Sequence, residues 1–192
     1  LGSSVAILSV GMANVAELQL AKVTLHAGDA GFSALVALAG VGIVAGSLTA
    51  TGGGSSPRMK RRYLIGLVTM AAGMLAAGFA PAFALAAAAF AGTGVGNGLA
   101  AANEQILVQR TAPREALGRV FGVKGTLISG AFGASFLCGG ALASLAGTRA
   151  VFLVGGAGLL AAWAWAGVAL RREFAEPPTA APAQPAGAVA AA

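Results

Sequence analysis

The chain has 192 residues, of which 57% are hydrophobic and only 9% are charged, and its mean hydropathy is +0.83. These values exclude an ordinary soluble domain, because there is too little polar surface to cover the apolar residues. The net charge of +6 does not indicate nucleic-acid binding, since the basic residues lie at the ends of apolar segments and not over a polar face with aromatic residues between them. The composition therefore predicts an integral membrane protein surrounded by a lipid bilayer.

Six apolar segments are each long enough to cross a bilayer as a helix, which takes about 20 residues. The expected helices span residues 4–23, 32–50, 64–80, 82–108, 120–145 and 150–170. They predict an all-α membrane protein with a transmembrane domain over residues 1–172. Residues 173–192 are rich in Pro and Ala and lack apolar periodicity, so we expect a disordered cytoplasmic tail.

Basic residues occur in alternate connections between these segments. They precede the third segment, surround the connection from the fourth to the fifth, and follow the sixth: Arg58, Lys60, Arg61, Arg62, Arg110, Arg114, Arg119, Lys124, Arg171 and Arg172. Short basic loops face the cytoplasm in membrane proteins. The pattern predicts a multi-pass protein of the plasma or inner membrane whose C-terminus is cytoplasmic.

Polar side chains inside the expected first helix are candidates for function, because they are costly in lipid. Asn14 and Glu17 are three residues apart and so share one face of this helix. Glu17 could bind a cationic group or exchange a proton. Alternatively, it reaches the outer interface or pairs with Lys22.

The expected fourth helix carries Asn97, Asn103 and Glu104. Asn97 has no charged neighbour and is a candidate for lining a cavity, although an Asn that bonds a neighbouring helix would give the same pattern. Glu104 lies near the cytoplasmic end, where Arg110 and the following loop are its nearest basic partners. An ion pair at the inner mouth is favoured for Glu104 over contact with a substrate.

The sequence lacks the motifs of several enzyme classes. It has no Gly-x-Ser-x-Gly nucleophile motif, no phosphate-binding lysine loop and no cluster of metal-binding residues. We therefore expect no enzyme activity, no metal and no cofactor, with a proton as the possible coupling ion.

Glycines four residues apart occur in several of the apolar segments. Such pairs let helix backbones approach closely in lipid, and they predict packing within the chain in preference to dimerisation. The pairs are Gly42 and Gly46, Gly92 and Gly96, Gly94 and Gly98, and Gly118 and Gly122.

Four short motifs indicate a protein family more specifically than composition does. They are Asn14-Val15-Ala16-Glu17, Gly28-Asp29-Ala30-Gly31, Gly46-Ser47-Leu48, and Gln109-Arg110 with Pro113 and Gly118-Arg119-Val120-Phe121. Together they resemble the C-terminal six helices of a major facilitator superfamily transporter, in the drug-efflux and enterobactin-exporter branch.

The resemblance implies half of a transporter, built as two inverted three-helix repeats, that works by alternating access around a central cavity. It implies that the first and fourth helices line this cavity, so that the candidates for the substrate and proton pathway are Asn14, Glu17, Asn97, Asn103 and Glu104. It implies cytoplasmic gating loops that contain Arg58, Arg61, Arg62, Gln109, Arg110, Gly118 and Arg119. The first of these loops lacks the aspartate of the family motif.

The expected function is proton-coupled efflux of small amphipathic molecules, of drug or siderophore type, as in multidrug-resistance antiporters. This function requires an N-terminal six-helix half outside the chain, and the chain is therefore expected to be part of a longer protein. Two alternatives stay open: a major facilitator importer of a small nutrient, and a membrane binding or assembly protein without transport.

Overall fold

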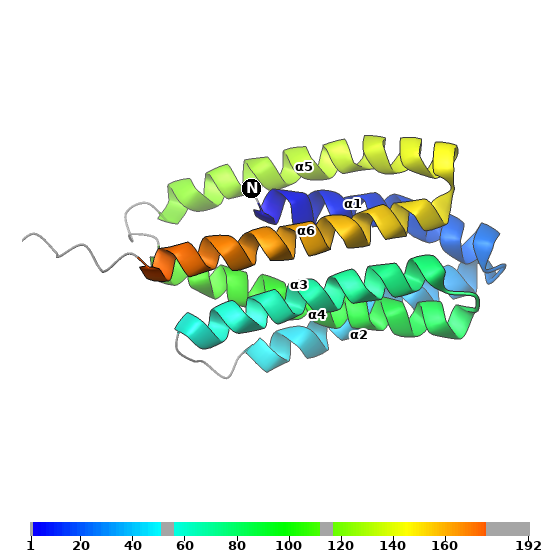
Figure 1. The fold of residues 1–192 in the computed structure, drawn as a ribbon. Helices are drawn as coiled ribbons and strands as arrows, with labels where there is room; N and C mark the ends of the chain where they lie inside the picture. Colours follow the sequence, from blue (N-terminus) through cyan, green and yellow to red (C-terminus); the bar gives the residue numbers. More distant parts are fainter. Residues whose placement is uncertain (1, 51–55, 112–116, 176–192) are drawn as a thin grey trace, which may run out of the picture.

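The computed structural model describes residues 2–50, 56–111 and 117–175 of the chain. This part of the chain contains six helices that are long and apolar enough to cross a membrane, and it contains no strand. The helices are α1 (Gly2–Gln19), which continues as the short π-helix η1 (Leu20–Thr24), α2 (Gly28–Ala50), α3 (Ser56–Phe79), α4 (Phe83–Thr111), α5 (Leu117–Ala146) and α6 (Thr148–Ala175). Figure 1 shows them as one bundle of roughly antiparallel helices. The predicted all-α membrane fold is confirmed.

Five helix ends lie three or more residues beyond the sequence-based expectation. α2, expected from residue 32 after a turn, begins at Gly28, and α4, expected to end at residue 108, ends at Thr111. The third helix was expected from residue 64, whereas α3 begins at Ser56, so the basic residues 58–62 lie in its first two turns and not in a loop. Apolar composition marks where a helix meets the membrane boundary, but Lys and Arg are good helix formers and Pro57 fits the first turn, so the helix continues beyond that boundary. Similarly, α5 begins at Leu117 and α6 continues to Ala175. The rest of the expected tail, residues 176–192, lies outside the described residues.

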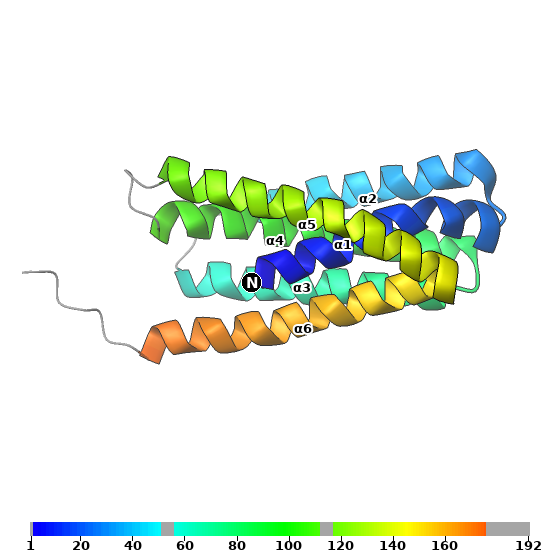
Figure 2. The same cartoon turned by 90° about the horizontal axis from the view of Figure 1, so that it is seen from above.

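The helices pack as two related groups of three. α4 packs between α2 and α3, α1 packs between α5 and α6, and α3 packs against α6. Exchanging α1 with α4, α2 with α5 and α3 with α6 reproduces all of these contacts. Three crossings along the chain separate each helix from its counterpart, so the two run in opposite directions, as Figure 2 shows for α1 and α4. The second group is therefore inverted relative to the first. Two inverted three-helix repeats are what the resemblance implies for one half of a major facilitator bundle.

Glycines set the closest helix contact, between α2 and α4. A Cβ atom at Gly42 or Gly46 would overlap the carbonyl oxygens of Ala91 or Val95, and one at Gly98 would overlap that of Ile43. The predicted intramolecular packing is therefore confirmed at Gly42, Gly46, Gly94 and Gly98, and also at Gly96, which packs against the α3 backbone at Gly66 and Met70. It is wrong at Gly92, Gly118 and Gly122, where an added Cβ would have no neighbour within 4 Å in the described part of the chain.

Candidate functional site

Two cavities lie between α1 and α4, which are not among the closely packed helix pairs. The larger, of about 250 Å³, is lined by residues of α1, α3, α4 and α5 and is partly open to the outside of the bundle. The smaller, of about 120 Å³, lies further along the same two helices and also contacts α2, α3 and α6. Val10 and Asn97 line both cavities. The two cavities are therefore neighbours along one interface.

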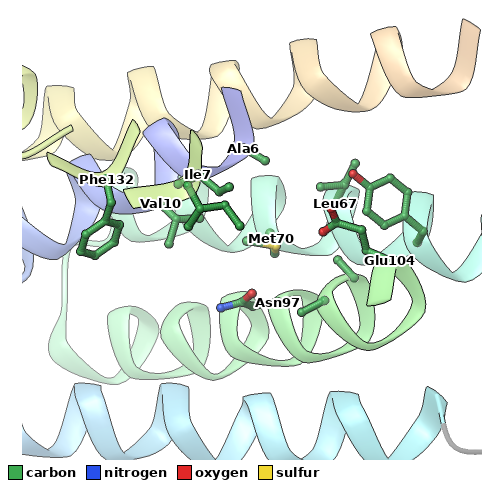
Figure 3. Close-up of a pocket in the computed structure, with 12 residues that line it drawn as sticks. Ala6, Ile7, Val10, Leu67, Met70, Asn97, Glu104 and Phe132 are labelled. Atoms are coloured by element: carbon green, nitrogen blue, oxygen red, sulfur yellow. The ribbon is translucent and has the colours of Figure 1, made fainter. Parts of the chain in front are cut away.

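The larger cavity is mostly apolar. Figure 3 shows Ile7 and Val10 of α1, Met70 of α3 and Phe132 of α5 around it, with Asn97 and Glu104 of α4 as its labelled polar members. Seven residues separate Asn97 from Glu104, which places both within about 20° on the same face of α4. Together with Tyr63 of α3, they supply the polar groups that line this cavity.

Glu104 forms an ion pair across the larger cavity's edge. Its carboxylate lies 3.0 Å from the Lys124 ammonium of α5, and the two side chains are 27% and 23% exposed. The sequence favours an ion pair for Glu104 and offers Arg110 and the following loop as its nearest basic partners. The structure pairs Glu104 with Lys124 of α5, where Lys124, Ile128 and Phe132 recur at four-residue steps on one face. That spacing indicates which face of α5 carries Lys124, but not which helix this face meets.

The smaller cavity contains a carboxyl group without a partner. Asn14 and Glu17 line it from α1, and Thr93 and Asn97 line it from α4. Glu17 is partly buried and has neither an ion pair nor a hydrogen bond to any described residue. The alternative pairing with Lys22 is not observed, since the Lys22 ammonium pairs with Asp29 in the first turn of α2.

Two aromatic side chains form part of the lining of the smaller cavity. Phe90 of α4 and Phe152 of α6 both line it and meet edge to face, with ring centroids 5.7 Å apart. Both rings are buried. Their place at the cavity has no signal in the sequence, because a Phe in an apolar segment gives no sign of which helix it will meet.

Asn103 does not lie with the other candidates. It is fully buried, its amide nitrogen donates to the Leu99 carbonyl oxygen at 2.7 Å, and it lines neither cavity. Six residues after Asn97 correspond to about 240° around the helix, so the two side chains cannot share a face. Its amide oxygen has no hydrogen-bond partner among the described residues.

The residues assigned to gating loops gather at one end of the bundle. They lie in the first turns of α3, the last turn of α4 and the first turn of α5: Arg58, Arg61, Arg62, Gln109, Arg110, Gly118 and Arg119. All of them are exposed except Arg62, which is partly buried. Residues 112–116 between them lie outside the described residues. Lys22, Asp29 and Arg149 lie at the opposite end, so the two ends differ strongly in positive charge.

The family follows from a comparison of the whole chain. A model of the Major Facilitator Superfamily matches residues 1–192. The chain belongs to this superfamily. Its members are transporters and not enzymes, so the chain is a multi-pass membrane transport protein. No curated protein and no solved structure matches the chain. The described residues hold no group of three or more His, Cys, Asp or Glu side chains placed to bind a metal ion.

Proposed function

We propose that this chain forms the C-terminal half of a proton-coupled exporter of small amphipathic or cationic molecules. The observation that carries the proposal is the unpartnered Glu17 carboxyl group in the smaller cavity. An ionisable group without a partner inside a membrane helix is costly and is a functional candidate by default. No described residue forms an ion pair or hydrogen bond with Glu17 that would explain a carboxyl group at this position as purely structural.

The surroundings of Glu17 favour a particular kind of ligand. Asn14, Thr93 and Asn97 supply hydrogen-bonding groups, whereas Phe90 and Phe152 supply apolar area beside them. Glu104, the other carboxylate at these cavities, is already paired with Lys124. A molecule with one positive group and an apolar body would match the single free carboxylate and the apolar walls.

Proton coupling follows if Glu17 holds only one partner at a time. Release of a bound cation leaves a negative carboxylate, and one proton taken up at the same oxygen atoms neutralises it. Binding of the next cation then requires that this proton leaves. When the cavity faces opposite sides of the membrane in the two steps, cation and proton move in opposite directions.

A transporter of this kind needs a second six-helix half and a defined orientation in the membrane. A major facilitator cavity forms between two six-helix halves, so an N-terminal half supplies the facing wall. The concentration of basic residues at one end of the bundle supports a cytoplasmic position for that end, with the C-terminus in the cytoplasm of a cell or inner membrane.

Accumulation of ethidium, a fluorescent lipophilic cation, tests the proposal in cells that lack their own efflux pumps. The complete transporter is expressed as the parent, as Glu17→Gln and as Asp29→Asn, with and without a protonophore. We expect the parent and Asp29→Asn to lower ethidium accumulation until the protonophore is added, and Glu17→Gln to have no effect at equal protein level.

Two results would count against proton-coupled export through Glu17. Export by Glu17→Gln at the parental rate would remove Glu17 from the coupling step. Unchanged accumulation in the parent for ethidium and for other amphipathic cations would remove the support for export and favour the importer or the non-transport alternative.

A further inference from the structure

One face of α3 is exposed along most of the helix. Arg58, Arg61, Ile65, Val68 and Ala72 follow one another at steps of three or four residues, so their side chains form a single stripe, called here the α3 stripe. All five are exposed, with Ile65 at 47% and Val68 at 36%. The α3 stripe therefore has two positive charges at the basic end of the bundle and is apolar beyond them.

The α3 stripe lies on the side of α3 opposite the larger cavity. Leu67 and Met70 are buried and line this cavity, and each follows one of the two arginines by nine residues, which is about two and a half turns. The helices pack in the order α2, α4, α3, α6, α1 and α5, which Figure 1 shows from bottom to top. Because α3 lies in the middle of this series and behind the cavity, a second half that faces the cavity leaves the α3 stripe in contact with lipid.

The length of α3 places the two arginines at the depth of the lipid headgroups. Eighteen residues separate Arg61 from Phe79, which ends α3 and is 69% exposed. At the helical rise this is about 27 Å, close to the thickness of the hydrocarbon layer, which is about 30 Å. Arg58 lies about 4.5 Å further out. When Phe79 is at one boundary of the hydrocarbon layer, both guanidinium groups are therefore at the other.

The two arginines are available to an anion outside the chain. Neither forms an ion pair or a hydrogen bond with a described residue, whereas the neighbouring Lys60 and Arg62 do interact with other groups. A guanidinium group binds phosphate through parallel hydrogen bonds, and lipid phosphates are the anions at this depth. Two adjacent positive charges favour a headgroup with a net negative charge over a zwitterionic one, because they repel the ammonium group of the latter.

We propose that Arg58 and Arg61 bind the phosphate group of an anionic phospholipid whose acyl chains lie along Ile65 and Val68. The phosphate compensates the two guanidinium charges at the membrane boundary, and the acyl chains cover the apolar part of the α3 stripe. The resemblance assigns both arginines to a gating loop, whereas this site gives them a contact with the surrounding bilayer. It depends neither on Glu17 nor on the direction of transport.

Quenching of a tryptophan on the α3 stripe tests the site. Val68→Trp is introduced into the complete protein after Trp163, Trp165 and any tryptophan outside this chain are replaced by phenylalanine. Seven residues place this reporter about 10 Å deeper than Arg61, beside the acyl chains. The protein is reconstituted in mixtures of phosphatidylglycerol and phosphatidylcholine, with brominated acyl chains on one lipid or the other. Quenching as a function of composition gives the preference for phosphatidylglycerol at the α3 stripe.

We expect the reporter protein to prefer phosphatidylglycerol. Arg58→Gln and Arg61→Gln should each lower the preference about fivefold, the effect of one basic residue near an anionic surface. The matched control is Arg119→Gln, which removes one exposed positive charge at the same end of the bundle but on α5, and it should leave the preference unchanged. Thermal unfolding in detergent identifies any variant that fails to fold, in which case methionine replaces glutamine at the same position.

Three results would overturn the site. They are the absence of any preference in the reporter protein, an unchanged preference after both α3 arginines are replaced in a folded protein, and an equal loss of preference in Arg119→Gln, which would indicate a general attraction of anionic lipid to the basic end. None of these measurements involves ethidium or a proton gradient. The lipid site and proton-coupled export can therefore fail separately.

Discussion

Gly46 of α2 lies directly against the carbonyl oxygen of Val95 in α4, so there is no room for a side chain between the two helices. We expect Gly46→Ala to lower the free energy of unfolding by about 1–3 kcal/mol, the usual cost of forcing extra volume into a packed site. Thermal unfolding in detergent measures this difference. Gly40→Ala on the same helix is the matched control, because a Cβ at Gly40 would have no neighbour within 4 Å. An equal loss of stability in both variants would contradict the packing described here.

Asn103 should act on stability and not on transport. Its buried amide oxygen lacks a hydrogen-bond partner among the described residues, and an unsatisfied buried group of this kind costs about 1–3 kcal/mol. Replacement by Leu, which has a similar shape, removes this cost. We expect Asn103→Leu to raise the thermal midpoint and to keep ethidium export, whereas Asn97→Leu at the cavities should impair export. Loss of export in a stable Asn103→Leu protein would place Asn103 in the pathway after all.

The Lys22–Asp29 ion pair should contribute little to stability. The Asp29 side chain is 87% exposed, and exposed ion pairs are worth no more than about 1 kcal/mol. We expect Asp29→Asn and Lys22→Gln to unfold within a few degrees of the parent in detergent, with the difference decreasing further as salt is added. A large loss of stability in either variant would show that this connection between η1 and α2 supports the bundle more strongly than its exposure indicates.

The sequence predicts the six crossings because each apolar segment is long enough for the bilayer. It does not predict that α3 begins at Ser56, since Arg58 and Arg61 are as compatible with a helix as with a loop and only the backbone decides between them. For the same reason, glycine spacing alone does not distinguish Gly46, which contacts another helix, from Gly122, which contacts no described residue.

Helix geometry predicts only some of the positions of the polar side chains at the cavities. The three-residue step from Asn14 to Glu17 places both side chains at one cavity, as periodicity alone suggests. Asn103 is close to Glu104 in sequence, yet it lies on another face of α4. The partner of Glu104 depends on how α5 packs beside α4, and this long-range contact has no local signature in the sequence.

Direct measurement of proton movement in proteoliposomes tests the central claim that Glu17 couples protons to export. The complete purified transporter is reconstituted with a pH-sensitive dye inside the vesicles, and ethidium is added on one side. For the parent and Asp29→Asn, we expect proton movement opposite to that of ethidium, whereas Glu17→Gln should show none. Proton movement in Glu17→Gln at the parental rate, or ethidium transport by the parent without any proton movement, would contradict it.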